Sequence, residues 1–486
     1  MVPDDEGGGL MRADLLTDAV DGLDEALAAV DGFDEALVGG LLRPQPGQAG
    51  ALAGLADAVA GSPLASRVAE AAEKAAAGAA GEDHFVALAA ARTALLGSVH
   101  DALVVRVEEA VGRPRAEEST AAPADGAEHA TNLSAAARSW LCDLARAGWR
   151  GIDHELVGGA APVVSAMLPD PALRRPATLL DGFAAELAAS CPGATLERIP
   201  VRRWADLWSR ALLLTLPGAA AVPAVAEVSG RLLPLGVDVQ EHATAVQAQV
   251  HAVFEPADGG TPRLVRASVS APKPDTVVGA GLWQLLRPRM SLLAAVSEGR
   301  AVELDAMPLT AGGDLLWDDA RARTGEPAEV FTTARVALPA AAAFPTSPLD
   351  RHPARIAVPV LLEGYAVDTA EGAEGAEGAE EGGGTVAFRV AGRRLAVDTD
   401  RAPAAGPLTP QDIASSGACV GLLRWDAGEF LLQPLAVERT VRKRAVAVHA
   451  GAWAGGTADK AGVRAEKAAT DAVKVLRERA GRLLRK

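Results

Sequence analysis

Two short polar segments contain residue types that carry out acid–base chemistry. A histidine stands between two carboxylates at residues 153–155, and residues 350–352 read Asp-Arg-His within a proline-rich stretch. A histidine general base needs a partner within hydrogen-bond reach. Neighbours in sequence on a helix point apart, so neither segment forms a catalytic pair by itself. We interpret both as ordinary polar segments, and a catalytic role is the alternative.

Motifs for phosphate, nucleotide or metal binding are incomplete. The segment 451–457 (GAWAGGT) has the glycines of a phosphate loop but lacks its lysine. Gln284 stands where the third glycine of a dinucleotide loop would follow Gly279 and Gly281. The aspartates at 318–319 and at 398 and 400 could bind a cation, but carboxylates of this kind usually lie in solvated turns. We therefore predict no catalytic residue, no metal ligand and no cofactor.

Charge and cysteine usage restrict the classes of partner. The 486-residue chain has a formal charge of −16, which argues against a surface built to bind nucleic acid. Three widely separated cysteines, Cys142, Cys191 and Cys419, fit neither a disulfide framework nor a zinc site. The acidic N-terminus and the lack of a long uninterrupted apolar stretch favour a cytoplasmic protein without a membrane segment.

The front of the chain has the apolar periodicity of helices. An echo of ten residues, VDGLDEAL at 20–27 and VDGFDEAL at 30–37, predicts an amphipathic helical pair with a solvated acidic face. Further helices are predicted at 48–60, 63–79 and 83–111, and again from Leu133. In the segment Pro200–Thr215, Trp204 and Trp208 lie on one face of a helix and arginines lie elsewhere.

In the C-terminal part of the chain, apolar and polar residues alternate with the period of two that is typical of strands. Strands are predicted at 246–254, 264–270, 301–306, 329–338, 355–367, 385–397, 418–424, 429–434 and 436–448, with a helix at 279–297. The segment 426–428 (Asp-Ala-Gly) predicts a hairpin turn, because glycine tolerates positive φ.

These segments predict an α+β fold: an N-terminal helical region, then a mainly antiparallel β domain and a C-terminal helix. The predicted parts are a helical domain with an acidic start (1–112), a linker (113–132), a second helical region (133–230), the β domain (231–450) and a basic C-terminal helix (451–486). The Glu-Ala-Gly repeat at 370–384 is predicted to be a disordered loop inside the β domain.

Tryptophan and arginine are the residue types most enriched at the centres of protein interfaces. The candidate contacts with a partner are Trp204, Trp208 and Arg203 on the predicted helix, and Arg442, Arg444, Arg477 and Arg482 near the C-terminus. The alternative for the tryptophan helix is that it docks in the protein's own core with arginines at the rim. The alternative for the basic tail is a solvated helix, or one docked on the acidic front.

Two segments carry a resemblance to a family. Residues 202–214 (RRWADLWSRALLL) and 415–434 (SSGACVGLLRWDAGEFLLQP) resemble uncharacterised actinobacterial proteins. These are of the type encoded beside SWIM zinc-finger proteins and MoxR-type ATPases with von Willebrand A partners. The chain itself lacks the zinc-finger spacing, the Walker motif and the metal-adhesion motif of those neighbours. The resemblance implies an accessory or interaction component whose partners are other proteins, among them a MoxR-type ATPase system.

The function expected from the sequence is therefore a non-enzymatic scaffold or adaptor of a cytoplasmic bacterial complex. The first alternative is an enzyme whose site is assembled from distant residues, which leaves no local motif. The second alternative is nucleic-acid binding through the basic tail, which the net charge disfavours.

Overall fold

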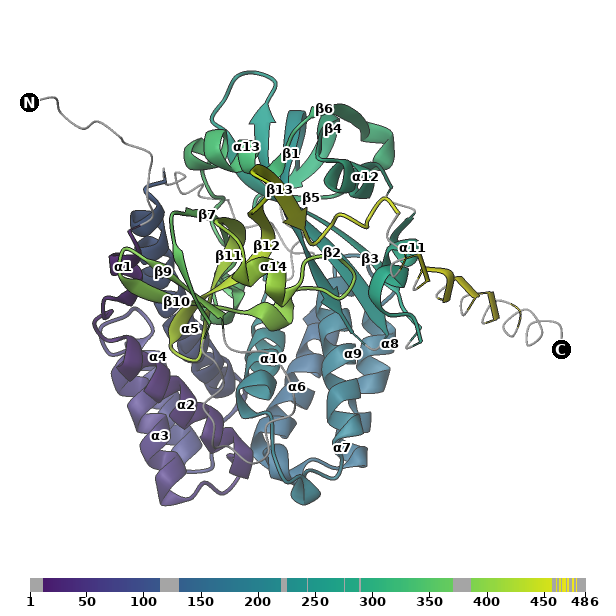
Figure 1. Ribbon diagram of the computed structural model, residues 1–486. Coiled ribbons are helices and arrows are strands. Elements are labelled where there is room, and N and C mark those ends of the chain that lie inside the picture. Colours follow the sequence, from purple (N-terminus) through teal and green to yellow (C-terminus); the bar gives the residue numbers. More distant parts are fainter. Residues whose placement is uncertain are drawn as a thin grey trace, which may run out of the picture.

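The computed structural model describes residues 12–113, 131–219, 225–242, 244–274, 276–287, 290–369 and 386–456, and isolated positions between residues 460 and 478. Helices occupy one half of the molecule and strands the other (Figure 1). The α+β class predicted from the sequence is confirmed. The predicted disordered loop at 370–384 lies outside the described residues, as do the acidic start and most of the predicted linker.

Ten α-helices form the first half of the chain within the described residues. They are α1 (Ala13–Thr17), α2 (Leu23–Gly39), α3 (Pro46–Ala58), α4 (Ala65–Ala76), α5 (Glu82–Val111), α6 (Thr131–Ala147), α7 (His154–Gly158), α8 (Ala160–Met167), α9 (Arg174–Ala189) and α10 (Val201–Leu214). The echo at 20–37 lies mostly in one helix, α2, and does not form the predicted helical pair.

Helices α2 to α10 share one hydrophobic core. Phe33 of α2, Leu88 of α5, Leu141 of α6 and Trp204 of α10 all belong to it. The boundary predicted between a helical domain ending at 112 and a second helical region starting at 133 therefore does not separate two hydrophobic cores. An amphipathic helix must bury its apolar stripe against a neighbour, and α5 and α10 bury theirs against helices from both sides of that boundary.

The first sheet contains six strands and follows the helices. They are β1 (Val225–Glu241), β2 (Ala245–Pro256), β3 (Arg263–Pro272), β4 (Arg300–Thr310), β5 (Asp314–Leu315) and β6 (Ala322–Pro327), in the order β1-β2-β3-β5-β4-β6. Because β4 also pairs with β1, the strands β1, β2, β3, β5 and β4 close into a ring. All pairings are antiparallel except β3 with β5.

The second sheet contains seven strands. They are β7 (Val358–Glu363), β8 (Ala366–Thr369), β9 (Val386–Val390), β10 (Arg393–Val397), β11 (Ala418–Asp426), β12 (Glu429–Val441) and β13 (Arg444–His449), in the order β7-β11-β12-β10-β9-β8 with β13 against β12. The predicted turn at 426–428 joins β11 to β12, and Ala427 and Gly428 there both have positive φ.

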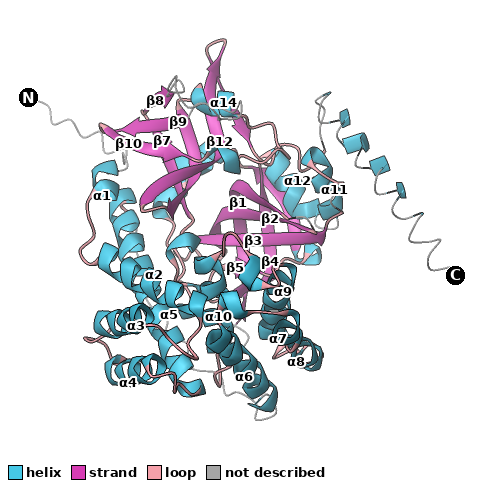
Figure 2. Cartoon of the chain, turned by 90° about the horizontal axis from the view of Figure 1, so that it is seen from below, coloured by secondary structure: helices cyan, strands magenta, loops and turns pink. Residues whose placement is uncertain are grey.

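Short helices lie beside the strands (Figure 1 and Figure 2). They are α11 (Leu282–Leu286), α12 (Met290–Glu298), α13 (Val330–Val336) and α14 (Pro410–Ala414). The prediction of a strand at 329–338 is wrong, because α13 occupies most of it. The Glu329 carboxylate caps this helix by accepting hydrogen bonds from the backbone N–H groups of Phe331 and Thr332. Phe331 then packs into a small core between the two sheets.

Helix α5 connects the two halves of the molecule. Its first part, from Phe85 to Leu96, lies in the helical core, whereas its second part, from Val99 to Ala110, lies in the core of the sheets. The charged cluster described next lies where this helix passes from one core to the other.

Candidate functional site

The cluster begins with a buried ion pair between α2 and α5. Arg92 Nε lies 2.6 Å from Asp34 Oδ1 and Arg92 Nη2 lies 2.9 Å from Asp34 Oδ2, so the contact is bidentate. Both residues are at most 1% exposed. Burial raises the pKa of Asp34 to about 6, although the Arg92 guanidinium acts in the opposite direction. The remaining nitrogen, Arg92 Nη1, has no hydrogen-bond partner and lies 3.6 Å from Asp206 Oδ1 on α10.

A loop from the β half of the chain closes over this pair. Asp350 in the loop accepts from Arg210 of α10 at 2.9 Å and from Arg355 at 2.7 Å. Arg175 of α9 lies 3.8 Å from the same carboxylate. Arg351 donates to Asp101 of α5 at 3.0 Å. The segment 350–352, interpreted from sequence as an ordinary turn, therefore forms ion pairs with three helices.

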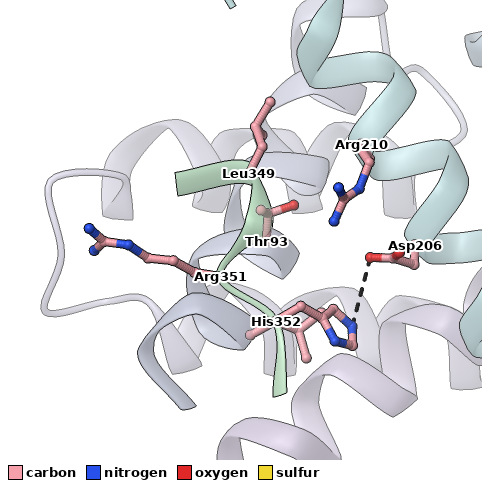
Figure 3. A pocket seen from close by; sticks show the side chains of 7 residues that line it. Thr93, Asp206, Arg210, Leu349, Arg351 and His352 are labelled. Atoms are coloured by element: carbon pink, nitrogen blue, oxygen red, sulfur yellow. Dashed lines mark ion pairs between the residues drawn. The ribbon is translucent and has the colours of Figure 1, made fainter. Parts of the chain in front are cut away.

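His352 completes the cluster and faces Asp206 (Figure 3). Its Nδ1 accepts a hydrogen bond from the backbone N–H of Ala354 at 3.1 Å, so the ring hydrogen is on Nε2 in the neutral form. Nε2 lies 3.7 Å from Asp206 Oδ1. Burial and the nearby Arg92, Arg210 and Arg355 guanidinium groups lower the pKa of His352 to about 4.

The space enclosed by this cluster limits its chemistry. Thr93, Asp206, Arg210 and His352 are among the residues around a cavity of about 10 Å³. That volume corresponds to roughly one water molecule. A neutral histidine beside a carboxylate is a combination that catalytic sites use. Here the space beside the two groups has about the volume of a water molecule, and the charges hold the loop against the helices.

A second buried polar network lies between the two sheets. Asp238 of β1 accepts from Gln433 Nε2 of β12 at 2.8 Å and from Arg424 Nη2 of β11 at 2.9 Å. His251 of β2 lies on the same face of the ladder, and its Nε2 has no hydrogen-bond partner. Burial lowers the pKa of His251 to about 3, with Arg266 and Arg424 adding to the effect and Asp238 opposing it.

An open notch lies beside the short strand β5. Ser268, Ser270, Asp314, Leu316 and Trp317 are among its lining residues, and its volume is about 460 Å³. The indole Nε1–H of Trp317 donates a hydrogen bond to Asp319 Oδ1 at 2.7 Å. Asp318 caps a turn by accepting from the backbone N–H of Ala320. The two carboxylates that follow Trp317 therefore have partners in this chain.

The predicted contact residues of α10 are mostly inside the protein. Trp204 and Trp208 are both 0% exposed, so the prediction that they present a binding surface is wrong. Trp204 packs edge-on against Trp149 at 5.8 Å, and Trp208 Nε1 donates to the Leu141 carbonyl. The alternative, a helix docked in its own core, is confirmed. Arg203 lies at the rim and forms a bidentate pair with Glu186.

The remaining predicted contact residues lie near the C-terminus. Arg442 and Arg444 are exposed at the turn between β12 and β13. Arg477 and Arg482 lie outside the residues whose side chains the structure describes. Between residues 460 and 478, the described side chains are exposed except that of Glu466, which pairs with Arg287 of the loop after α11 at 2.7 Å. This part of the chain projects from the body (Figure 1).

Metal, thiol and membrane chemistry have little support among the described residues. In those ranges, no three His, Cys, Asp or Glu side chains gather as metal ligands. Cys142 and Cys419 are buried, and burial raises the pKa of Cys142 to about 12, which suppresses its thiolate. Among the described helices, α5 alone has the length and apolarity of a membrane span, and 56% of the qualifying window is buried within the protein.

Comparison of the chain with protein-family models, with curated proteins and with solved structures finds no match. The geometry of the described residues is therefore the basis for any proposal about function.

Proposed function

We propose that the protein is a non-enzymatic scaffold or adaptor of a cytoplasmic bacterial complex. The observation that carries this proposal is the ribbon formed by the end of β12 and the start of β13. Every residue from Val441 to Ala447 is exposed, so the ribbon adds little to the protein's own core. An exposed, unpaired strand edge is a template for pairing with another chain, which proteins otherwise cover or shorten.

The polar clusters inside the molecule support the same proposal. The His352 cluster encloses about one water, and the Asp238 network lies between two packed sheets. Both join segments that are distant in sequence: the first holds a loop of the β half against the helices, and the second holds the two sheets together. The resemblance to proteins encoded beside MoxR-type ATPases suggests that a complex of this kind supplies the partners.

The experiment is affinity purification of the tagged full-length protein from its native host at moderate salt, followed by mass spectrometry. We expect one or two partners in stoichiometric amounts. The double variant Arg442→Glu/Arg444→Glu should reduce their recovery. The matched control is Arg393→Glu/Arg394→Glu, which reverses two exposed arginines at the start of β10, after another turn of the same sheet.

The alternatives predict different results. Recovery of the protein alone, with every variant, would contradict the scaffold proposal and favour an enzyme of unrecognised type. Recovery of nucleic acid that is lost on deleting residues 439–486, and that falls steeply with salt, would favour binding through the basic tail.

A further inference from the structure

The β12–β13 ribbon ends in a turn that needs a left-handed backbone at two positions. Val441 pairs with Arg444, so Arg442 and Lys443 form a two-residue turn, with φ of 50° and 64°. Turns of this type usually contain Asn or Gly, because a side chain at positive φ is disfavoured. Two long cationic side chains at these positions therefore cost stability and place positive charge at the tip.

The hydrogen bonds of the ladder show which backbone groups of β13 are free. The Ala450 N–H donates to the Leu435 carbonyl, so the residue pairs that exchange hydrogen bonds include 437 with 448, 439 with 446 and 441 with 444. Ala445 and Ala447 lie between these pairs and direct their N–H and C=O groups away from β12. Within the described residues, no strand pairs with that outer edge of β13 (Figure 1).

The side chains around this edge leave it open and make it cationic. Ala445 and Ala447 are small, so a second backbone can approach within the strand spacing of about 4.8 Å. Arg439 is paired with Asp412 at 2.7 Å, but in the described ranges Arg442, Lys443 and Arg444 have no ion-pair partner. These three cations stand on a chain whose formal charge is −16.

We propose that the outer edge of β13 binds an extended acidic segment of a partner protein by strand addition. This inference rests on the proposed scaffold function and specifies the partner's chemistry. Main-chain hydrogen bonds to Ala445 and Ala447 supply affinity, as in other complexes formed by strand addition. Carboxylates of the added strand lie near Arg442 and Arg444. Exposed Val446, which is 38% accessible, supplies an apolar contact.

An acidic occupant fits better than a second copy of this chain. Two β13 edges paired with each other provide no carboxylate for the cations of either ribbon, because residues 444–449 contain neither Asp nor Glu. The attraction to an acidic strand is local, because the Debye length is about 8 Å at physiological ionic strength. The negative charge of the rest of the protein is therefore screened at the ribbon, whereas the cations at the tip act on an adjacent strand at short range.

The test uses the full-length protein and a capped peptide of about ten residues in which Glu and Thr alternate. Fluorescence anisotropy gives the affinity at low salt. Ala447→Pro removes the outward N–H without disturbing the bonds to β12, since an edge strand accommodates proline on its free side. The matched control, Ala447→Thr, keeps the N–H. We expect Ala447→Pro to weaken binding about tenfold and Ala447→Thr to change it little.

Two further measurements separate strand addition from simple charge attraction. A peptide of the same sequence with alternate backbone nitrogens methylated should bind about tenfold more weakly, since it loses the main-chain hydrogen bonds. Arg442→Glu/Arg444→Glu should abolish binding, whereas Arg393→Glu/Arg394→Glu should not. Hydrogen exchange of the free Ala447→Pro variant checks that the ribbon still forms.

Several outcomes would overturn the proposal. These are equal binding of the methylated peptide, equal binding by Ala447→Pro, or no binding of the acidic peptide at all. A concentration-dependent dimer in sedimentation that Ala447→Pro abolishes would identify a second copy as the occupant instead. The scaffold function is tested separately: native partners that co-purify equally well with Ala447→Pro would leave it standing and reject only strand addition.

Discussion

Asp34 and Arg92 form an ion pair from which water is almost completely excluded. Removing each charge from water costs several kcal/mol, and their attraction offsets this cost only while both partners are present. The two parallel hydrogen bonds also fix how α2 packs against α5. The contribution of this pair to the fold therefore depends on its remaining intact.

Replacing Arg92 with methionine leaves the Asp34 carboxylate buried without its partner. We expect Arg92→Met to lower the free energy of unfolding at neutral pH by about 3–5 kcal/mol. Urea denaturation measures the change. The matched control is Arg202→Met, which removes the bidentate partner of Asp31 where α10 packs against α2. Arg202 is 77% exposed, so that change should cost less than about 1 kcal/mol.

The double variant Asp34→Leu/Arg92→Met distinguishes the loss of the attraction from the cost of a buried, unpaired charge. If the unpaired Asp34 carboxylate causes the decrease in the free energy of unfolding, the double variant recovers most of the stability, because no charge remains at this place in the core. A double variant no more stable than Arg92→Met would show that packing, not the unpaired charge, determines the cost.

The sequence contains only a weak signal for this pair. Arg92 is a lone charge in an apolar helical stretch, which points to burial. Asp34, however, repeats the spacing of Asp24 in the ten-residue echo, and that pattern indicates a solvated acidic face. The two residues are 58 positions apart. Only the packing of α2 on α5, which a single sequence does not encode locally, brings them together.

At the scale of elements, periodicity predicts helices better than it predicts strands in this chain. The predicted helices at 48–60, 63–79 and 83–111 correspond to α3, α4 and α5. Strand β1 was missed, because Pro234 and two glycines within it are typical of a loop. The structure accommodates Pro234 at a shift in register beside Gly236, beyond the part of β1 that pairs with β4.

Gly236 sets the distance between the two sheets. A Cβ atom at this position would lie 2.6 Å from Leu435 Cβ, where β1 crosses β12. We expect Gly236→Ala to lower the free energy of unfolding by about 1–3 kcal/mol, because the sheets must separate or Leu435 must move. Thermal and urea denaturation both report this change. Gly417→Ala is the control, since nothing lies within 4 Å of a Cβ built there.

A second substitution tests the contact itself. Leu435→Gly removes the Cβ atom that the new methyl group would meet, and by itself it creates a cavity and is destabilising. In combination with Gly236→Ala it makes room for the new methyl group. The double variant should therefore be less destabilised than the sum of the two single variants. Strict additivity would mean that this crossing does not determine the sheet spacing.

At the scale of the whole molecule, the burial of histidines makes the stability of the fold depend on pH. Burial lowers the pKa of His251 to about 3 and that of His352 to about 4, and it also lowers the pKa of His100 and His449. His251 lies between the sheets, His352 lies in the loop at 347–355, His100 lies on α5 and His449 is the last residue of β13. The buried histidines therefore lie in both halves of the fold.

We expect the protein to lose stability as the pH falls below about 6.5, where histidines of the unfolded chain begin to bind protons. Between that value and the lowered folded-state pKa, the unfolded state binds more protons than the folded state. Each such histidine therefore reduces the free energy of unfolding by up to about 1.4 kcal/mol per pH unit. Asp34, with its pKa raised to about 6, acts in the opposite direction between about pH 6 and 4.

Replacing one buried histidine shows how much that residue contributes to the pH dependence of the free energy of unfolding. His251→Phe loses no hydrogen bond at Nε2, since that atom has no partner. Between pH 6.5 and 5, the fall in its free energy of unfolding should be shallower than that of the native chain by about 1.4 kcal/mol per pH unit. His154→Gln, at an exposed position, should follow the native curve. Parallel curves for His251→Phe and the native chain would show that the pKa of His251 is the same in the folded and unfolded states. The polar network between the sheets would then be open to solvent, and the two sheets would move apart in the native state.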